Sequence, residues 1–176
     1  MKIEKEMVSK LPREYLFVSG ILDLNVKYFK KRIEEGVKAS NINYKTNVYG
    51  RHTAWDFFNK DKEFGLLLCQ MIDHLESLSM DLQRFYLQSS WGIIEGVGEY
   101  TQRHHHEPNY ISGVLYLNDH PQKLYFPEIN QEITPKPGRF AIFSSFLQHQ
   151  TKRNIKHKSK YAISFNLRNI TISETF

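Results

Sequence analysis

Three consecutive histidines, His104, His105 and His106, are the densest group of metal-ligand side chains in the sequence. Because side chains alternate along an extended segment, His104 and His106 should project to one face and His105 to the other. Such a pair alone is more typical of a polar surface turn. His149, however, follows an aromatic-rich segment on what should be a different strand. Three imidazoles from two strands can hold one face of an Fe(II) ion and leave positions open for O2 chemistry.

Other residues could complete a site around that metal. Lys160 opens a β-like segment eleven residues after His149 and could pair with a carboxylate as a point charge. Trp91, Tyr100 and the aromatic side chains of residues 140–146 are candidates to line a pocket, although core packing is the expected role of most. The histidines in polar contexts are predicted to lie at the surface: His52, His120 and His157.

The texture of the chain changes near residue 80. Before it, Asp23 can cap a helix over residues 24–37, and a second helix is predicted over residues 61–79. In the second helix, His74 is expected to face solvent or cap a neighbour. After residue 80, turn residues separate five short β-like segments: 84–94, 111–117, 123–126, 139–143 and 161–167.

Strands at intervals of about ten residues favour an antiparallel sandwich or barrel. We therefore expect an α+β fold in which N-terminal helices pack on a jelly-roll sheet. No linker divides the chain, so residues 1–176 are predicted to form a single domain. Its helical part should cover about 1–80 and its jelly-roll core about 84–170.

Composition excludes several classes of protein. With 40% hydrophobic and 24% charged residues, the chain reads as globular rather than disordered. A single cysteine, Cys69, excludes an internal disulfide framework and is typical of a reducing compartment. No apolar stretch is long enough for a membrane span, and acidic residues close to Met1 interrupt any signal peptide. We therefore expect a cytoplasmic protein with no membrane partner.

Five lysines and arginines gather in residues 152–160. A run of this kind is usually a solvated loop. The alternative is a patch that recruits an anionic macromolecule, either protein or nucleic acid. Because the run lies between His149 and Lys160, we expect it near the mouth of the site.

Six sequence motifs between residues 90 and 166 follow the order and spacing of motifs in a known protein family. They are SWG (90–92), GEYTQRHHH (98–106), SGVLYLND (112–119), LYFPE (124–128), PKPGRFAIFSSFLQHQ (135–150) and KYAISFN (160–166). Together they resemble the double-stranded β-helix core of the 2-oxoglutarate/Fe(II)-dependent oxygenases. Within that superfamily they are most similar to small oxygenases of phages and marine bacteria, which carry an H-x-H metal motif.

The resemblance implies that His104 and His149 are metal ligands. His106 stands where most of the superfamily has aspartate, so either His106 completes the set or water or Glu107 does. On an extended chain Glu107 should point away from His104, which favours His106. The resemblance also implies that Lys160 binds the distal carboxylate of 2-oxoglutarate, with Tyr116 donating a hydrogen bond to the same group.

The implied activity is a hydroxylase that uses Fe(II), O2 and 2-oxoglutarate and releases succinate and CO2. Ala162 stands where relatives often have a serine hydroxyl, so some contacts to the co-substrate should differ. The prime substrate stays open among a protein side chain, a nucleobase and a small metabolite.

Two other functions compete with this one. The first is a three-histidine dioxygenase of the cupin type that oxidises a metal-bound substrate without 2-oxoglutarate. The second is a jelly-roll binding module without catalysis, whose histidines are vestigial or bind zinc. The position of Lys160 relative to the histidines separates the first alternative from the favoured activity.

Overall fold

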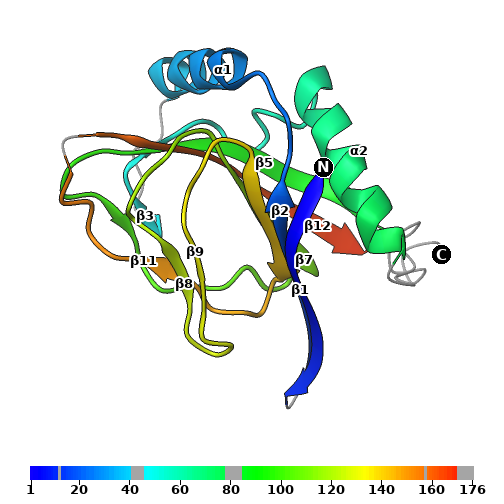
Figure 1. Ribbon diagram of the computed structural model, residues 1–176. Coiled ribbons are helices and arrows are strands. Elements are labelled where there is room, and N and C mark those ends of the chain that lie inside the picture. Colours follow the sequence, from blue (N-terminus) through cyan, green and yellow to red (C-terminus); the bar gives the residue numbers. More distant parts are fainter. Residues whose placement is uncertain (12, 41–45, 78–84, 157, 170–176) are drawn as a thin grey trace.

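The computed structural model describes residues 1–11, 13–40, 46–77, 85–156 and 158–169 (Figure 1). The helices are α1 (Val26–Ala39) and α2 (Lys62–Ser77). The strands are β1 (Lys2–Leu11), β2 (Arg13–Ile21), β3 (Val48–Tyr49), β4 (Arg51–His52), β5 (Phe85–Glu95), β6 (Tyr100–Thr101), β7 (Ile111–Tyr116), β8 (Leu124–Phe126), β9 (Gln131–Ile133), β10 (Arg139–Ser144), β11 (Gln150–Thr151) and β12 (Lys160–Asn169).

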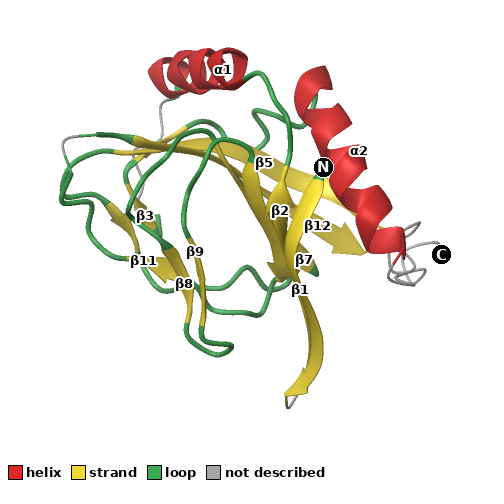
Figure 2. Ribbon diagram, in the orientation of Figure 1, coloured by secondary structure: helices red, strands yellow, loops and turns green. Residues whose placement is uncertain are grey.

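Most of these strands form one antiparallel sheet in the order β1-β2-β10-β7-β12-β5-β4. A smaller sheet, in the order β11-β8-β9, lies across from it, and β3 pairs with β6. Figure 2 shows both helices on the outer side of the large sheet and the small sheet on its other side. The predicted α+β jelly roll with helices packed on its sheet is confirmed.

Two apolar clusters hold these layers together. Side chains of α1 and α2, such as Ile33 and Met71, pack on the outer face of the large sheet. The second cluster fills the space between the sheets and includes Tyr116, Phe126 and Phe143, of which the two phenylalanine rings meet edge to face at 4.8 Å. Alternation along each strand divides its side chains between the two clusters.

The sequence did not predict the N-terminal hairpin of β1 and β2, because residues 1–80 were expected to be helical. β2 is an interior strand, paired with β1 on one side and β10 on the other. Residues 15–20 are all buried, so this strand reads as a continuous apolar run rather than as an alternating pattern. Such a run has no helical period, and its length suits a strand.

The helices begin close to where the sequence placed them. Asn25, rather than Asp23, caps α1, since its side chain accepts a hydrogen bond from the Tyr28 amide at 3.0 Å. Asp61 caps α2 in the same way, through the Phe64 amide at 3.0 Å. Neither described helix is long and apolar enough to cross a membrane.

Candidate metal centre

The backbone brings the histidines of two distant segments together. His104 and His149 form an isolated antiparallel bridge, in which each amide donates to the other's carbonyl, at 3.2 and 3.0 Å. The His106 amide donates to the Ser145 carbonyl at 2.8 Å. The segment after β6 is therefore held beside the loop that follows β10, and the side chains of His104, His106 and His149 converge between them.

His104, His106 and His149 converge as the sequence predicts. One ligand nitrogen from each lies within 4.8 Å of the other two, and among the described residues these three form a group that could hold a metal ion. The Nε2 atoms of His106 and His149 are 3.2 Å apart. This spacing matches three ligands arranged around one small cation.

Hydrogen bonds orient two of the rings. Nδ1 of His104 lies 2.7 Å from the Gln102 carbonyl, and Nδ1 of His149 lies 3.0 Å from the Leu147 carbonyl. A carbonyl only accepts, so each Nδ1 carries the proton and donates it. The lone pair of each neutral ring is then on Nε2, which is the arrangement of a metal-binding histidine with its outer nitrogen fixed by the backbone.

Burial keeps the imidazoles neutral. Loss of solvent lowers the pKa of His106 to about 3, with further lowering from His104 and His105. Burial also lowers the pKa of His149 well below its usual value, and neighbouring histidines add to the effect. The pKa of His104 falls for the same main reason. Neutral imidazole is the form that binds metal, so no proton has to leave at neutral pH.

The neighbours of these three histidines point elsewhere. Glu107 pairs with Arg13 at 2.9 Å, and its other oxygen is 3.8 Å from Nδ1 of His105. His105 and Glu107 therefore share the outer face of the segment, as alternation predicts. This placement argues for His106, rather than Glu107, as the third ligand.

A narrow cavity of about 50 Å³ connects the histidines with Lys160 and Tyr116. Lys160 is 3% exposed and its ammonium lies 6.0 Å from the centre of the Tyr116 ring. Ala162 also lines this cavity. The structure therefore brings both residues that the resemblance assigned to the co-substrate into the cavity that contains the three histidines.

Sequence reasoning missed Glu95, which lines the same cavity. Glu95 is fully buried and forms an ion pair with Lys160, directly across from it on the neighbouring strand. Burial lowers the pKa of Lys160, and Glu95 opposes that shift. In the sequence, Glu95 stands out only as an acidic residue at the end of an apolar run. Its partner becomes apparent only from the register of β5 against β12.

A second cavity, of about 300 Å³, shares Trp91, His104 and His106 with the first. Trp55 also lines it and meets Trp91 edge to face, with ring centroids 4.9 Å apart. The indole N–H of Trp91 is buried and has no hydrogen-bond partner among the described residues. His104 and His106 thus also border this second cavity, which is larger than the first and is lined by two tryptophans.

Several other predictions need correction. His52 and His120 are buried, at 6% and 3% exposure, and each donates a ring N–H to a backbone carbonyl, which satisfies the buried nitrogen. His157 lies outside the described residues. Tyr100 stacks on Tyr49 at 4.6 Å and lines neither histidine cavity. His74 binds the carboxylate of Glu6 at 2.7 Å.

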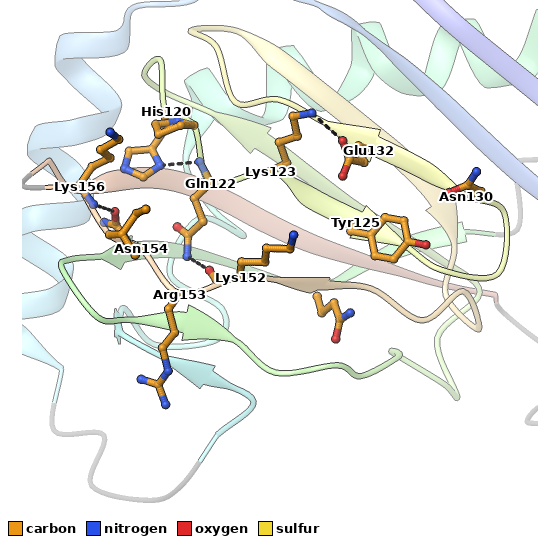
Figure 3. Close-up of a pocket in the computed structure, with 13 residues that line it drawn as sticks. His120, Gln122, Lys123, Tyr125, Asn130, Glu132, Lys152, Arg153, Asn154 and Lys156 are labelled. Carbon is orange, nitrogen blue, oxygen red and sulfur yellow. Dashed lines mark hydrogen bonds and ion pairs between the residues drawn. The ribbon is translucent and has the colours of Figure 1, made fainter.

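The basic run lines a separate hollow of about 590 Å³, here called the basic hollow, beside the small sheet (Figure 3). Its lining includes Lys123, Lys152 and Lys156, and Lys123 pairs with Glu132 at 2.6 Å. Lys123 and Lys152 adjoin Leu124 and Thr151, which line the histidine cavity. Alternation along β8 and β11 thus places the basic hollow on the opposite face of that sheet, not at the mouth of the histidine cavity.

No family model and no curated protein matches the sequence. Solved structures do match the fold. A viral collagen prolyl hydroxylase of Paramecium Bursaria Chlorella virus-1 superposes with a TM-score of 0.68 at 13% identity, over 89% of this chain and 96% of that one. A Pseudomonas putida prolyl-4-hydroxylase gives 0.65 at 14% identity, over 87% and 92%.

HygX of Streptomyces hygroscopicus, solved with nickel, 2-oxoglutarate and hygromycin B bound, gives 0.60 at 13% identity, over 88% of this chain and 82% of that one. The chain therefore has the double-stranded β-helix fold of 2-oxoglutarate-dependent oxygenases. At sequence identities of 13–14%, this similarity establishes the fold alone.

Proposed function

We propose that this protein is an oxygenase that uses Fe(II), O2 and a 2-oxo acid, with 2-oxoglutarate as the co-substrate to test first. The observation that carries the proposal is the convergence of three neutral imidazoles on an open cavity. The fold supports it, since the similar solved structures include prolyl hydroxylases and a protein with bound nickel and 2-oxoglutarate. Likeness to the small phage and marine-bacterial subgroup belongs to the same proposal.

The donor set fits the metal. His104, His106 and His149 would hold it through ring nitrogens, and imidazole suits Fe(II). Three neutral ligands leave the charge of a divalent ion uncompensated, which favours an anionic ligand such as the carboxylate of a 2-oxo acid. When bound, iron would supply the O2 activation and C–H oxidation that side chains cannot perform.

The protein's own residues would position and enclose the reactants. The carbonyls of Gln102 and Leu147 fix the rings of His104 and His149. Phe126 and Phe143 lie against the His149 ring, with centroids 5.5 and 4.9 Å away, and exclude water from that side. These contacts hold the ligand set in place before the metal binds.

The second cavity, which Trp55 and Trp91 line, is the proposed binding site of the prime substrate. Among the described residues, its lining contains aromatic, amide and hydroxyl side chains and no carboxylate, lysine or arginine. The free indole N–H of Trp91 is a donor for an acceptor on the substrate. We infer that the group to be hydroxylated is uncharged and that Trp91 helps to orient it.

The first experiment measures succinate from 2-oxoglutarate by the Fe(II)-loaded protein in air. We expect His149→Ala to lose at least about 100-fold of this activity and most of its iron, because each ligand is part of the metal site. His74→Ala is the matched control, since His74 is an imidazole on α2 that pairs with Glu6 and lines neither histidine cavity. It should keep both iron and activity, and thermal melting should show that each variant folds.

The outcomes separate the alternatives. Succinate from the wild type and from His74→Ala, but not from His149→Ala, supports the proposal. Bound iron without turnover of any 2-oxo acid would favour a three-histidine dioxygenase that acts directly on a metal-bound substrate. Absence of both iron and turnover would favour a binding module.

We also propose that the basic hollow recruits an anionic partner. Lys152 and Lys156 add positive charge to a hollow large enough to admit several side chains. Because this hollow lies on the far face of the small sheet, such a partner would bind without entering the histidine cavity.

A further inference from the structure

Glu95 and Lys160 form a buried ion pair inside the cavity that reaches the metal ligands. Glu95 is 0% exposed and Lys160 is 3% exposed. The two residues stand directly opposite one another in the pairing of β5 with β12, so the strands themselves set their approach. The hydroxyl of Thr101 donates to the other oxygen of Glu95 at 2.5 Å and fixes the carboxylate.

This pair changes what the cavity can recognise. A free buried ammonium would attract a carboxylate strongly, but the charge of Lys160 is already balanced by Glu95. A second carboxylate brought to Lys160 would lie close to the negative oxygens of Glu95. Like charges repel strongly where burial keeps water away, so the pair opposes a ligand with a negative distal end.

The metal end of the cavity has the opposite preference. Three neutral histidines leave a bound divalent ion with its full charge, which attracts the carboxylate and keto oxygens of a 2-oxo acid. The free volume of the whole cavity is only about 50 Å³, which accommodates a short and uncharged tail more readily than a solvated carboxylate. Charge and size therefore point in the same direction.

We propose that Glu95 is a specificity-determining residue that makes this site accept 2-oxo acids without a distal carboxylate at least as well as 2-oxoglutarate. The inference rests on the proposed function, because it presumes that a 2-oxo acid binds at the metal. Glu95 acts by neutralising Lys160, while Thr101 positions it.

The test compares two ligands that differ in one group, 2-oxoglutarate and 2-oxopentanoate. Calorimetry measures their binding to the full-length protein loaded with Mn(II), in the absence of turnover. In the wild type, 2-oxopentanoate should bind as tightly as 2-oxoglutarate or more tightly. In Glu95→Gln, the preference should shift toward 2-oxoglutarate by at least about tenfold, because the neutral amide leaves Lys160 free to pair with the distal carboxylate.

Two variants separate this effect from a general one. Glu35→Gln removes the same charge from an exposed pair with Arg32 on α1, away from both histidine cavities and the basic hollow, and should leave the preference unchanged. Glu95→Gln combined with Lys160→Met should lose the gain for 2-oxoglutarate, since no cation then remains at the distal end. Thermal melting and Mn(II) stoichiometry show which variants keep their fold and metal site.

A wild type that prefers 2-oxoglutarate, or a folded Glu95→Gln whose preference does not shift, overturns the inference while leaving the proposed function intact. If Glu95→Gln does not fold, the wild-type comparison alone decides between these results. If Mn(II) binds but neither acid does, both the inference and the proposed function fail.

Discussion

At the scale of single residues, the candidate metal centre depends on imidazoles that stay neutral because they are buried together. His106 shows this most clearly, since desolvation lowers its pKa to about 3 and His104 and His105 lower it further. In the unfolded chain an ordinary histidine has a pKa near 6.5. The fold therefore disfavours protonation of the three histidines, and each ring keeps a nitrogen lone pair that can bind a metal.

This shift predicts how stability depends on pH. Between about pH 3 and 6.5 the unfolded chain binds a proton at His106 that the folded chain does not, so acidification favours unfolding. The contribution is present above the unfolded pKa and is lost as pH falls toward the folded one. By pH 5 the metal-free protein should lose about 2 kcal/mol of unfolding free energy from this residue.

Urea unfolding of metal-free wild type and His106→Gln at pH 7 and pH 5 measures that contribution. The glutamine variant has no proton to bind at this position, so its loss of stability between the two pH values should be smaller. Equal losses in the two proteins would show that His106 is not held neutral by the fold.

At the scale of elements, α1 can sit on the large sheet because β5 has a glycine beneath it. A Cβ on Gly92 would lie 2.5 Å from Cγ1 of Ile33, which is 0% exposed in α1. That close approach fixes the height of the helix over the strand that carries Trp91 and Glu95. The packing of α1 is thus coupled to the strand that lines both cavities.

Gly92→Ala should therefore destabilise the protein by about 1–3 kcal/mol, because a methyl group would overpack this contact. Gly65→Ala is the matched control, since nothing lies within 4 Å of its added Cβ in α2. In α2 the same change should stabilise by about 0.5–1 kcal/mol through helix propensity. Thermal or urea unfolding of both variants tests the contrast, and equal effects would contradict it.

Features set by neighbouring residues could be predicted from the sequence, whereas features set by strand pairing could not. Turn residues and runs rich in aromatic and β-forming side chains located β5, β7, β8, β10 and β12 within a few residues, because these signals are local. β2 was missed because residues 1–80 were expected to be helical. Glu95 was missed because strand register decides its partner. The convergence of His104, His106 and His149 was expected from a His-x-His pair, a third histidine on another strand and the resemblance to the oxygenase core.

At the scale of the whole molecule, the excess of positive charge is placed away from the proposed reaction. The formal net charge is +5, and the basic hollow gathers Lys152 and Lys156 on the outer face of the small sheet. Arg153 is engaged with the Tyr100 ring at 4.5 Å and with the Gly98 carbonyl at 3.0 Å, so its role is partly structural. The lysines are therefore the residues with which to test anion binding.

Changing Lys152, Lys156 and Lys158 together to serine should lower the salt concentration at which the protein elutes from a heparin column, used as a polyanion probe. Each lost phosphate-like contact weakens binding and reduces its dependence on salt. The control changes three exposed lysines elsewhere to serine: Lys27, Lys60 and Lys62. Equal charge is removed in both, so only a localised surface gives different elution.

Turnover of the 2-oxo acid by the triple serine variant shows whether the basic hollow affects the metal centre. Because the basic hollow and the histidine cavity lie on opposite faces of the small sheet, the triple serine variant should keep wild-type turnover without a prime substrate. An unchanged elution would refute the recruiting surface. Lost turnover would instead show that charge in residues 152–158 supports Lys160 and the cavity beneath it.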